Sequence, residues 1–124
     1  MRFCWTTISV KDMDASISFY QDLIGLKLNR RVKVNDVIEL AFLGEDETQV
    51  ELKCDVHSRQ INHSNDISLG FIVNSIDQFA EFLDSKGISV QSGPFQPDPS
   101  IKFIYIQDPD GLKIQLVENV DQGL

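Results

Sequence analysis

The sequence is poor in basic residues and in histidine. Eleven Lys and Arg residues stand against nineteen Asp and Glu residues, for a formal net charge of −8, and there are only two histidines. Nucleic-acid binding depends on a Lys/Arg surface that displaces counterions from phosphates, so no nucleic-acid partner is expected. The acidic balance favours a cationic or neutral small ligand, although a solvated acidic surface produces the same charge.

Cysteine and long apolar runs are also scarce. Cys4 and Cys54 are too few and too far apart for a disulfide scaffold or a CxxC metal site, which favours two reduced thiols. No apolar run reaches the roughly 18 residues of a membrane-spanning helix. The opening stretch MRFCWTTISV has no signal-peptide apolar core. We therefore expect a cytoplasmic protein with no membrane partner.

What the sequence does contain is an internal repeat. The stretch ISVKDMDASISFYQDLIGLKL matches FIVNSIDQFAEFLDSKGISV with Val10 over Val73, a shift of 63. The stretch ELAFLGEDETQVEL matches FIYIQDPDGLKIQL with Glu51 over Gln115, a shift of 64. Residues 44–47 then lie over the turn Asp-Pro-Asp-Gly at 108–111. The matched order of patterns, more than shared letters, indicates two copies of one unit.

Each copy has the same predicted elements. Residues 3–10 and 67–73 are rich in β-branched and aromatic residues, which favours strands. Ser75 and Gln78 form a capping-box pattern, while Asp12 or Asp14 starts the first helix. Gly25 and Gly87 are positioned to end the two helices. Three strands follow each helix, and the last two form a hairpin.

The sequence therefore predicts one α+β domain over residues 1–124, built from two βαβββ modules. Module 1 covers about residues 1–54, a linker covers 55–65, and module 2 covers about 66–119. Because neither copy can cover both faces of its sheet, the modules should pack with pseudo-twofold symmetry as a cupped, mostly antiparallel sheet around a shared cavity. Residues 92–102, rich in Pro and Ser, are expected to form a mobile loop over the cavity mouth.

The stretches ISVKDMDASISFYQDLIGLKL and FIYIQDPDGLKIQLVE resemble the vicinal oxygen chelate superfamily. That superfamily includes glyoxalase I, extradiol dioxygenases and bleomycin-resistance proteins. The resemblance covers about residues 3 to 118 and implies a cavity that, in glyoxalase-like members, holds a divalent metal. One residue from the first strand and one from the last strand of each module bind that metal. The resemblance also implies a homodimer, whose cavities lie either within one chain or between two chains.

The repeat places those four positions at Trp5, Glu51, Ser68 and Gln115. Metal-using relatives carry His or Glu there. The indole nitrogen of Trp has no lone pair for a metal, and Ser and Gln are weak neutral ligands. We therefore expect no metal, the alternative being nickel, zinc or manganese in an atypical site. The loop histidines His57 and His63 lie off these positions.

Each candidate residue has two interpretations. Trp5 either fills core volume or forms an aromatic wall for a ligand. Glu51 is either ion-paired with Arg30, Lys53 or Lys113, or serves in the cavity as a general base. Strand alternation places Glu51 on the polar face of its strand and turns Cys54 away from the cavity.

Two functions from different classes follow. The first is a metal-free, small-molecule-binding protein of the bleomycin-resistance type, in which Trp5, Glu51, Ser68 and Gln115 contact the ligand. The second is a glyoxalase-like lyase or isomerase in which Glu51 abstracts a proton α to a carbonyl. We favour binding, since loss of a metal electrophile removes the larger part of the stabilisation that such chemistry requires.

Overall fold

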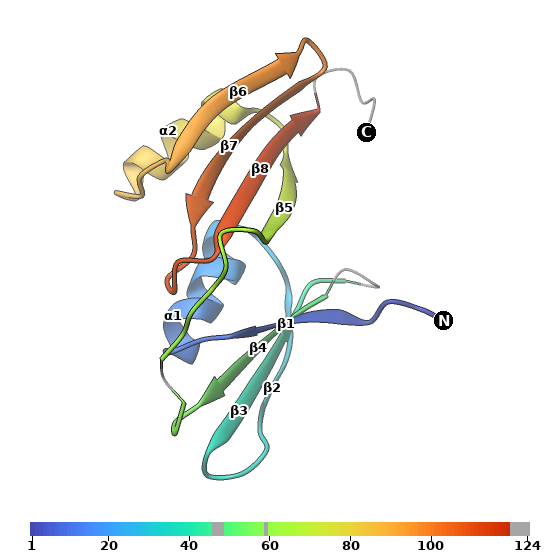
Figure 1. Ribbon diagram of the computed structural model, residues 1–124, viewed down its shortest axis with the longest axis vertical. Coiled ribbons are helices and arrows are strands. Elements are labelled where there is room, and N and C mark those ends of the chain that lie inside the picture. Colours follow the sequence, from blue (N-terminus) through green and yellow to red (C-terminus); the bar gives the residue numbers. More distant parts are fainter. Residues whose placement is uncertain (46–48, 59, 120–124) are drawn as a thin grey trace. The chain divides into compact units, whose positions relative to one another are not determined.

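The computed structural model describes residues 1–45, 49–58 and 60–119, and the chain divides into two compact units, 1–62 and 63–124. Each unit contains one four-stranded sheet and one helical segment (Figure 1). The elements of the first unit are β1 (Trp5–Ser9), α1 (Met13–Ser18), the π-helical turn η1 (Phe19–Leu23), β2 (Leu28–Lys33), β3 (Ile38–Leu43) and β4 (Gln49–Asp55). Those of the second are β5 (Ser68–Val73), α2 (Ile76–Ser85), β6 (Ser92–Asp98), β7 (Ile101–Gln107) and β8 (Lys113–Asn119).

The two sheets share one topology. Strand order is β1-β4-β3-β2 in the first unit and β5-β8-β7-β6 in the second. The first and last strands of each unit pair in parallel, and the other pairs are antiparallel. The predicted α+β class and the duplicated βαβββ order are therefore confirmed. The packing of the two modules around a shared cavity stays a prediction.

The helices begin at the polar residues that the sequence indicates. The Asp12 carboxylate accepts a hydrogen bond from Ala15 N at 3.1 Å, so Asp12, and not Asp14, is the cap of α1. The Ser75 hydroxyl accepts one from Gln78 N at 3.2 Å. These contacts satisfy amide groups that have no partner within the first helical turn.

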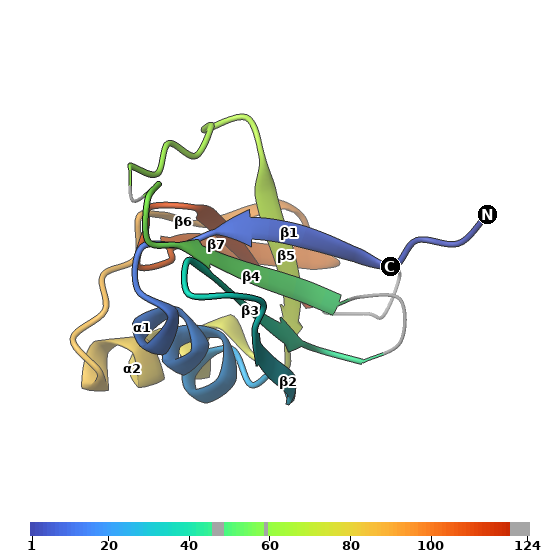
Figure 2. The same ribbon diagram turned by 90° about the horizontal axis from the view of Figure 1, so that it is seen from below.

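One face of each sheet is buried under its helix (Figure 2). On that face of the first sheet, every second side chain of β1, β3 and β4 points toward α1. The buried side chains there, including Val10 just after β1, are Ile8, Val10, Ala41, Leu43, Val50 and Leu52. The second sheet has the same arrangement with Ile104, Ile106, Ile114 and Leu116. The opposite face of each sheet carries the polar and aromatic side chains, as period-two alternation requires.

The strand register corrects the repeat alignment inside the hairpins. The alignment places Phe42 over Ile106, but in the structure Phe42 lies opposite Glu51 and Tyr105 lies opposite Gln115. The third strands are therefore related by 63 residues and the fourth strands by 64. The extra residue lies in the turn of the second hairpin, where a shift of one exchanges the two faces of a strand.

The second turn is held by its first residue. Asp108 is buried, and its carboxylate accepts hydrogen bonds from Asp110 N at 2.9 Å and Leu112 N at 2.8 Å. Gly111 has a φ of 90°, which favours glycine. The turn predicted from Asp-Pro-Asp-Gly is therefore present. Its counterpart predicted at 44–47 lies partly outside the described residues.

The expectation of a mobile loop over 92–102 is wrong. Ser92–Asp98 forms β6, the edge strand of the second sheet, and β7 begins at Ile101 after a short turn. Only three residue pairs join β6 to β7, with register shifts between them. Proline lacks an amide donor, so Pro94 and Pro97 are tolerated in a strand only at an edge or an irregularity, and β6 provides both.

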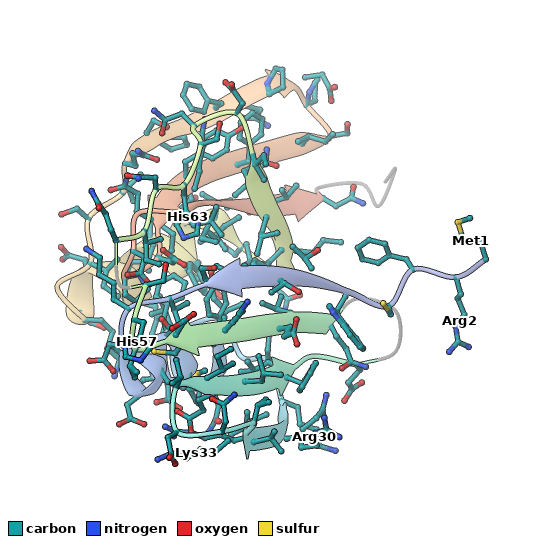
Figure 3. All side chains as sticks on the ribbon, turned by 60° about the horizontal axis from the view of Figure 1, so that its bottom comes forward. Met1, Arg2, Arg30, Lys33, His57 and His63 are labelled. Carbon is teal, nitrogen blue, oxygen red and sulfur yellow. The ribbon has the colours of Figure 1, made fainter. Side chains whose placement is uncertain are left out.

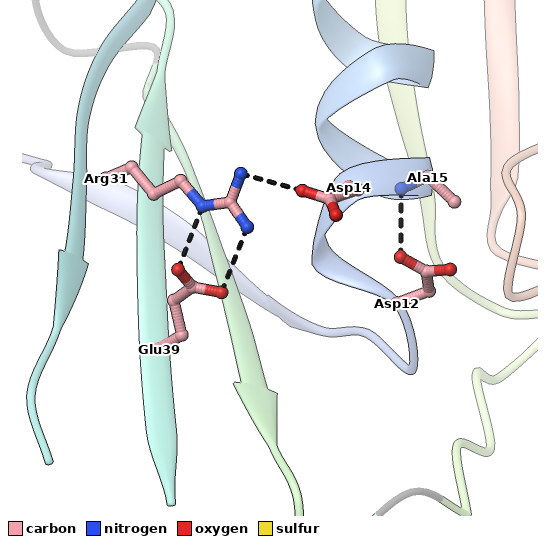
Figure 4. Close-up of polar contacts among 5 residues, drawn as sticks. All are labelled: Asp12, Asp14, Ala15, Arg31 and Glu39. Atoms are coloured by element: carbon pink, nitrogen blue, oxygen red, sulfur yellow. Dashed lines mark hydrogen bonds and ion pairs between the residues drawn. The ribbon is translucent and has the colours of Figure 1, made fainter. Parts of the chain in front are cut away.

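Arg31 ties the first helix to its sheet (Figure 4). Its guanidinium pairs with Glu39 of β3 at 2.9 Å and with Asp14 of α1 at 2.8 Å. The hydrogen bonds to Glu39 and then Asp14 raise the pKa of Arg31. Since arginine is already charged at any physiological pH, the raised pKa does not change the charge of Arg31 there. None of the described helices is both long and apolar enough to cross a membrane.

The difference between the two sheet faces can be measured with two isoleucines of neighbouring strands. Ile114 is fully buried, whereas Ile72 is 71% exposed. We expect Ile114→Ala to lower the free energy of unfolding by about 2–5 kcal/mol, because it leaves a cavity in the core. Ile72→Ala should change it by less than about 0.5 kcal/mol in urea denaturation. An equal loss in both variants would show that the face carrying Ile72 is covered.

Candidate functional site

A row of four side chains crosses the face of the first sheet that points away from α1. We call this face, and its counterpart in the second sheet, the open face. Strand register aligns Thr7 of β1 with Glu51 of β4, Glu51 with Phe42 of β3, and Phe42 with Arg30 of β2. All four point away from α1, because they alternate with the buried residues of their strands. A hydroxyl, a carboxylate, an aromatic ring and a guanidinium therefore lie side by side.

Glu51 is the buried polar group of this row. It is 9% exposed, and its carboxylate accepts a hydrogen bond from the Thr7 hydroxyl. Within this unit, none of the described residues forms the ion pair with Glu51 that was considered for Arg30 or Lys53. A hydroxyl donor lowers the cost of burying the carboxylate without neutralising its charge. Glu51 therefore presents a negative charge to whatever occupies this face.

Two aromatic rings and a cation adjoin the carboxylate. Trp5 packs edge-to-face on Phe42 with ring centroids 5.3 Å apart, and 42% of Trp5 remains exposed. On β2 (Figure 3), Arg30 holds its guanidinium carbon 5.1 Å from the centroid of the Phe42 ring. With 42% of its surface exposed, Trp5 does not fill the core of its own unit. Its role as an aromatic wall for a ligand stays a prediction.

The second sheet carries a different set on the corresponding face. Gln115 of β8 lies opposite Gly70 of β5 and Tyr105 of β7. A Cβ atom placed on Gly70 would be 3.7 Å from the Gln115 side-chain oxygen, so the amide lies over the glycine. Ser68 lies two residues earlier on β5, opposite Lys113. The Lys113 ammonium is 4.2 Å from the centroid of the Tyr105 ring.

The four predicted positions therefore fall into two pairs. Trp5 and Glu51 share the open face of the first sheet, and Ser68 and Gln115 share that of the second. Sequence reasoning missed Thr7, which register places nearer to Glu51 than Trp5 is. Alternation along β1 could have found it, since residues 5 and 7 point to the same side. Cys54 is buried on the helix side, as expected.

The donor chemistry at these positions does not fit a divalent transition metal. One carboxylate, one hydroxyl, one amide and one indole leave a single strong ligand, and that carboxylate is already an acceptor for Thr7. Nowhere in residues 1–45, 49–58 and 60–119 do three or more His, Cys, Asp and Glu side chains gather in a group that could hold a metal ion.

The two histidines lie outside the row on the first sheet and outside the corresponding set on the second sheet. His57 follows β4, where its backbone amide donates to the Asp55 carboxylate at 2.9 Å, and His63 precedes β5 (Figure 3). Neither belongs to a strand face that carries Glu51 or Gln115.

A separate cleft of about 380 Å³ lies on the helix side of the first sheet, between the start of α1 and the β2–β3 hairpin. Its charged lining mixes both signs, and Arg31, Asp14 and Glu39 there already pair with one another. Such a lining resembles a solvated surface more than a binding site. The open faces remain the better candidates, because aromatic and polar groups converge there.

Comparison with known proteins shows the family. The model of the Glyoxalase/Bleomycin resistance protein/Dioxygenase superfamily matches residues 2–116. The uncharacterized protein YwbC of Bacillus subtilis is 33% identical over 130 residues, covering 94% of this chain and 97% of that one. A lactoylglutathione lyase of Salmonella typhimurium is 30% identical over 133 residues, covering 99% and 96%. Leishmania major glyoxalase I has a similar structure, with a TM-score of 0.81, 25% identity and coverage of 95% and 86%.

The chain therefore belongs to the glyoxalase, bleomycin-resistance and dioxygenase superfamily. The resemblance found in the sequence is confirmed, and with it the fold. Membership in this superfamily leaves the chemistry open, because one fold serves both catalysts and binding proteins.

The bond between Thr7 and Glu51 can be tested by removing its donor. We expect Thr7→Val to lower the free energy of unfolding by about 1–3 kcal/mol at pH 7, because it leaves a buried carboxylate without its hydroxyl partner. Thr7→Ser keeps the hydroxyl and serves as the matched control. Chemical denaturation of both variants measures the difference. Equal stabilities for the Val and Ser variants would contradict the assigned hydrogen bond.

Proposed function

We propose that this protein binds a small organic molecule without a metal, on the open faces of its two sheets. The observation that carries the proposal is the set of groups at the four family positions, where Trp5 and Gln115 stand in place of metal-binding residues. Trp5, Phe42 and Arg30 supply aromatic and cationic surface, while Glu51, Ser68 and Gln115 supply polar contacts. This combination suits recognition of a ring-containing ligand with polar substituents.

A second candidate function is catalytic. Similarity to a lactoylglutathione lyase supports it, as does Glu51, a buried carboxylate whose recorded partner is a neutral hydroxyl. In that reaction class Glu51 would abstract a proton from a carbon next to a carbonyl. The developing oxyanion would then need an electrophile. Arg30 is the cation nearest to Glu51 along the row, and its guanidinium is directed over Phe42.

We further propose that the protein is a cytoplasmic homodimer. Superfamily resemblance supports a pairing of chains. Two exposed apolar side chains, Ile67 just before β5 and Ile72 within β5, are compatible with a dimer interface. Light scattering after size exclusion would give the mass of two chains. A mass of one chain at micromolar concentration would contradict the dimer.

The metal-free part of the proposal has a direct test. Protein purified without a metal-affinity tag should contain far less than one metal ion per chain by mass spectrometry. Nickel, zinc or manganese should leave the melting temperature unchanged, because tight binding to the folded state would raise it by mass action. Near-stoichiometric metal that is lost in Glu51→Gln would overturn the metal-free proposal and favour the lyase.

Ligand binding has its own test, for which the sole tryptophan is the reporter. Compounds from a small-molecule library that raise the melting temperature should also change Trp5 fluorescence. Glu51→Gln should alter the affinity of those compounds by about tenfold, the effect of one charge-assisted hydrogen bond. The matched control is Glu81→Gln, an exposed glutamate of α2. A library that yields no ligand, together with lactoylglutathione lyase activity that depends on Glu51, would replace binding by catalysis.

A further inference from the structure

Three aromatic rings form a continuous cluster on the open face of the second sheet. Phe95 of β6 lies 5.4 Å from Phe103 and 6.3 Å from Tyr105, and the two β7 rings are 5.7 Å apart, all between centroids. Beside the cluster is an open apolar hollow of about 470 Å³, lined by Phe95, Gln96, Pro97 and Phe103. Phe95 is 44% exposed even with these neighbours. The edge strand β6 thus adds the Phe95 ring to the two rings of β7, Phe103 and Tyr105.

The charged group next to the Tyr105 ring is a cation. Lys113 holds its ammonium over the Tyr105 ring, and among the described residues it makes no ion pair. On β5, β7 and β8, alternation places on this face side chains without a carboxylate, namely Ser68, Gly70, Ile72, Phe103, Tyr105, Gln107, Gln115 and Val117. On β6, register aligns Asp98 with Ile101 at the opposite end of the cluster, and its carboxylate accepts hydrogen bonds from Ser100. Gln115 follows Lys113 on the same side of β8. An ammonium and an amide therefore stand at one end of an aromatic surface.

We propose that the second module binds an elongated aromatic monocarboxylate, an inference that rests on the proposed ligand-binding function and adds the ligand class. The ring would occupy the hollow at Phe95 and Phe103, and the carboxylate would reach Lys113 and the Gln115 amide. Tyr105 lies between the two, so acid and ring should be separated by a short linker. A cationic ligand would meet Lys113 as a like charge.

The net charge of −8 does not decide against an anion here. At physiological ionic strength the Debye length is about 8 Å, so exposed acidic groups further away are largely screened. Contact groups then dominate, and at the Tyr105 end of this face they are Lys113 and Gln115, whereas Asp98 lies at the opposite end, by Ile101. The first sheet is different, because its buried Glu51 would repel a carboxylate. The anion class is therefore specific to the second module.

The test uses three matched probes and the full chain labelled with ¹⁵N. The probes are 4-phenylbutanoate, 4-phenylbutanamide and 4-phenylbutylamine, which share a ring and linker and differ in charge. We expect saturable amide shifts in β6, β7 and β8, with the carboxylate binding about tenfold more tightly than the amide and the amine weakest. Lys113→Gln should bring the carboxylate to the affinity of the amide.

Lys86→Gln is the matched control, because Lys86 also lies over a ring, 5.7 Å from the centroid of Phe82, but on α2. It should leave all three affinities unchanged. Equal binding of the three probes, or an unchanged carboxylate affinity in Lys113→Gln, would overturn the anion class while leaving ligand binding in place. No saturable shift with any probe would overturn the inference for this face. The proposed function fails separately, through the Trp5 fluorescence and metal tests.

Discussion

One-sided burial is the constraint on which the rest of this structure depends. Each sheet buries one face under a single helix, so period-two alternation divides every strand into core and open positions. Leu52 and Leu116 lie on the buried side, and their neighbours Glu51 and Gln115 consequently lie on the other. A polar residue between apolar neighbours in the last strand of a module, such as Glu51 in β4 or Gln115 in β8, is therefore a feature of the open face and not a defect in the core.

Duplication has produced two open faces with different chemistry. Where the first unit has Thr7 beside Glu51, the second has Gly70 beside Gln115. Both faces retain a cation over an aromatic ring, Arg30 over Phe42 and Lys113 over Tyr105. Such pairs are stronger when partly desolvated, which a ligand seated on the face would bring about. The two modules thus share a cation placed over an aromatic ring and differ in the polar groups beside it.

Family membership and site chemistry point in different directions. The fold is that of glyoxalase-like enzymes, yet the four positions predicted from the family resemblance include an indole that has no lone pair to donate. Glu51 is the one carboxylate among these four positions, and the Thr7 hydroxyl donates a hydrogen bond to it.

The sequence by itself determined the duplicated βαβββ order, the helix cap at Ser75 and the side of β4 on which Glu51 lies, because these follow from local periodicity and turn chemistry. The choice of Asp12 over Asp14 as the first cap came from the structure. Only the tertiary structure decided that Thr7 contacts Glu51, that Tyr105 and not Ile106 corresponds to Phe42, and that residues 92–98 form an edge strand. The physical reason is register. A hairpin shifted by one residue keeps its local pattern but exchanges its faces, and the partners across the sheet alone show which alignment holds.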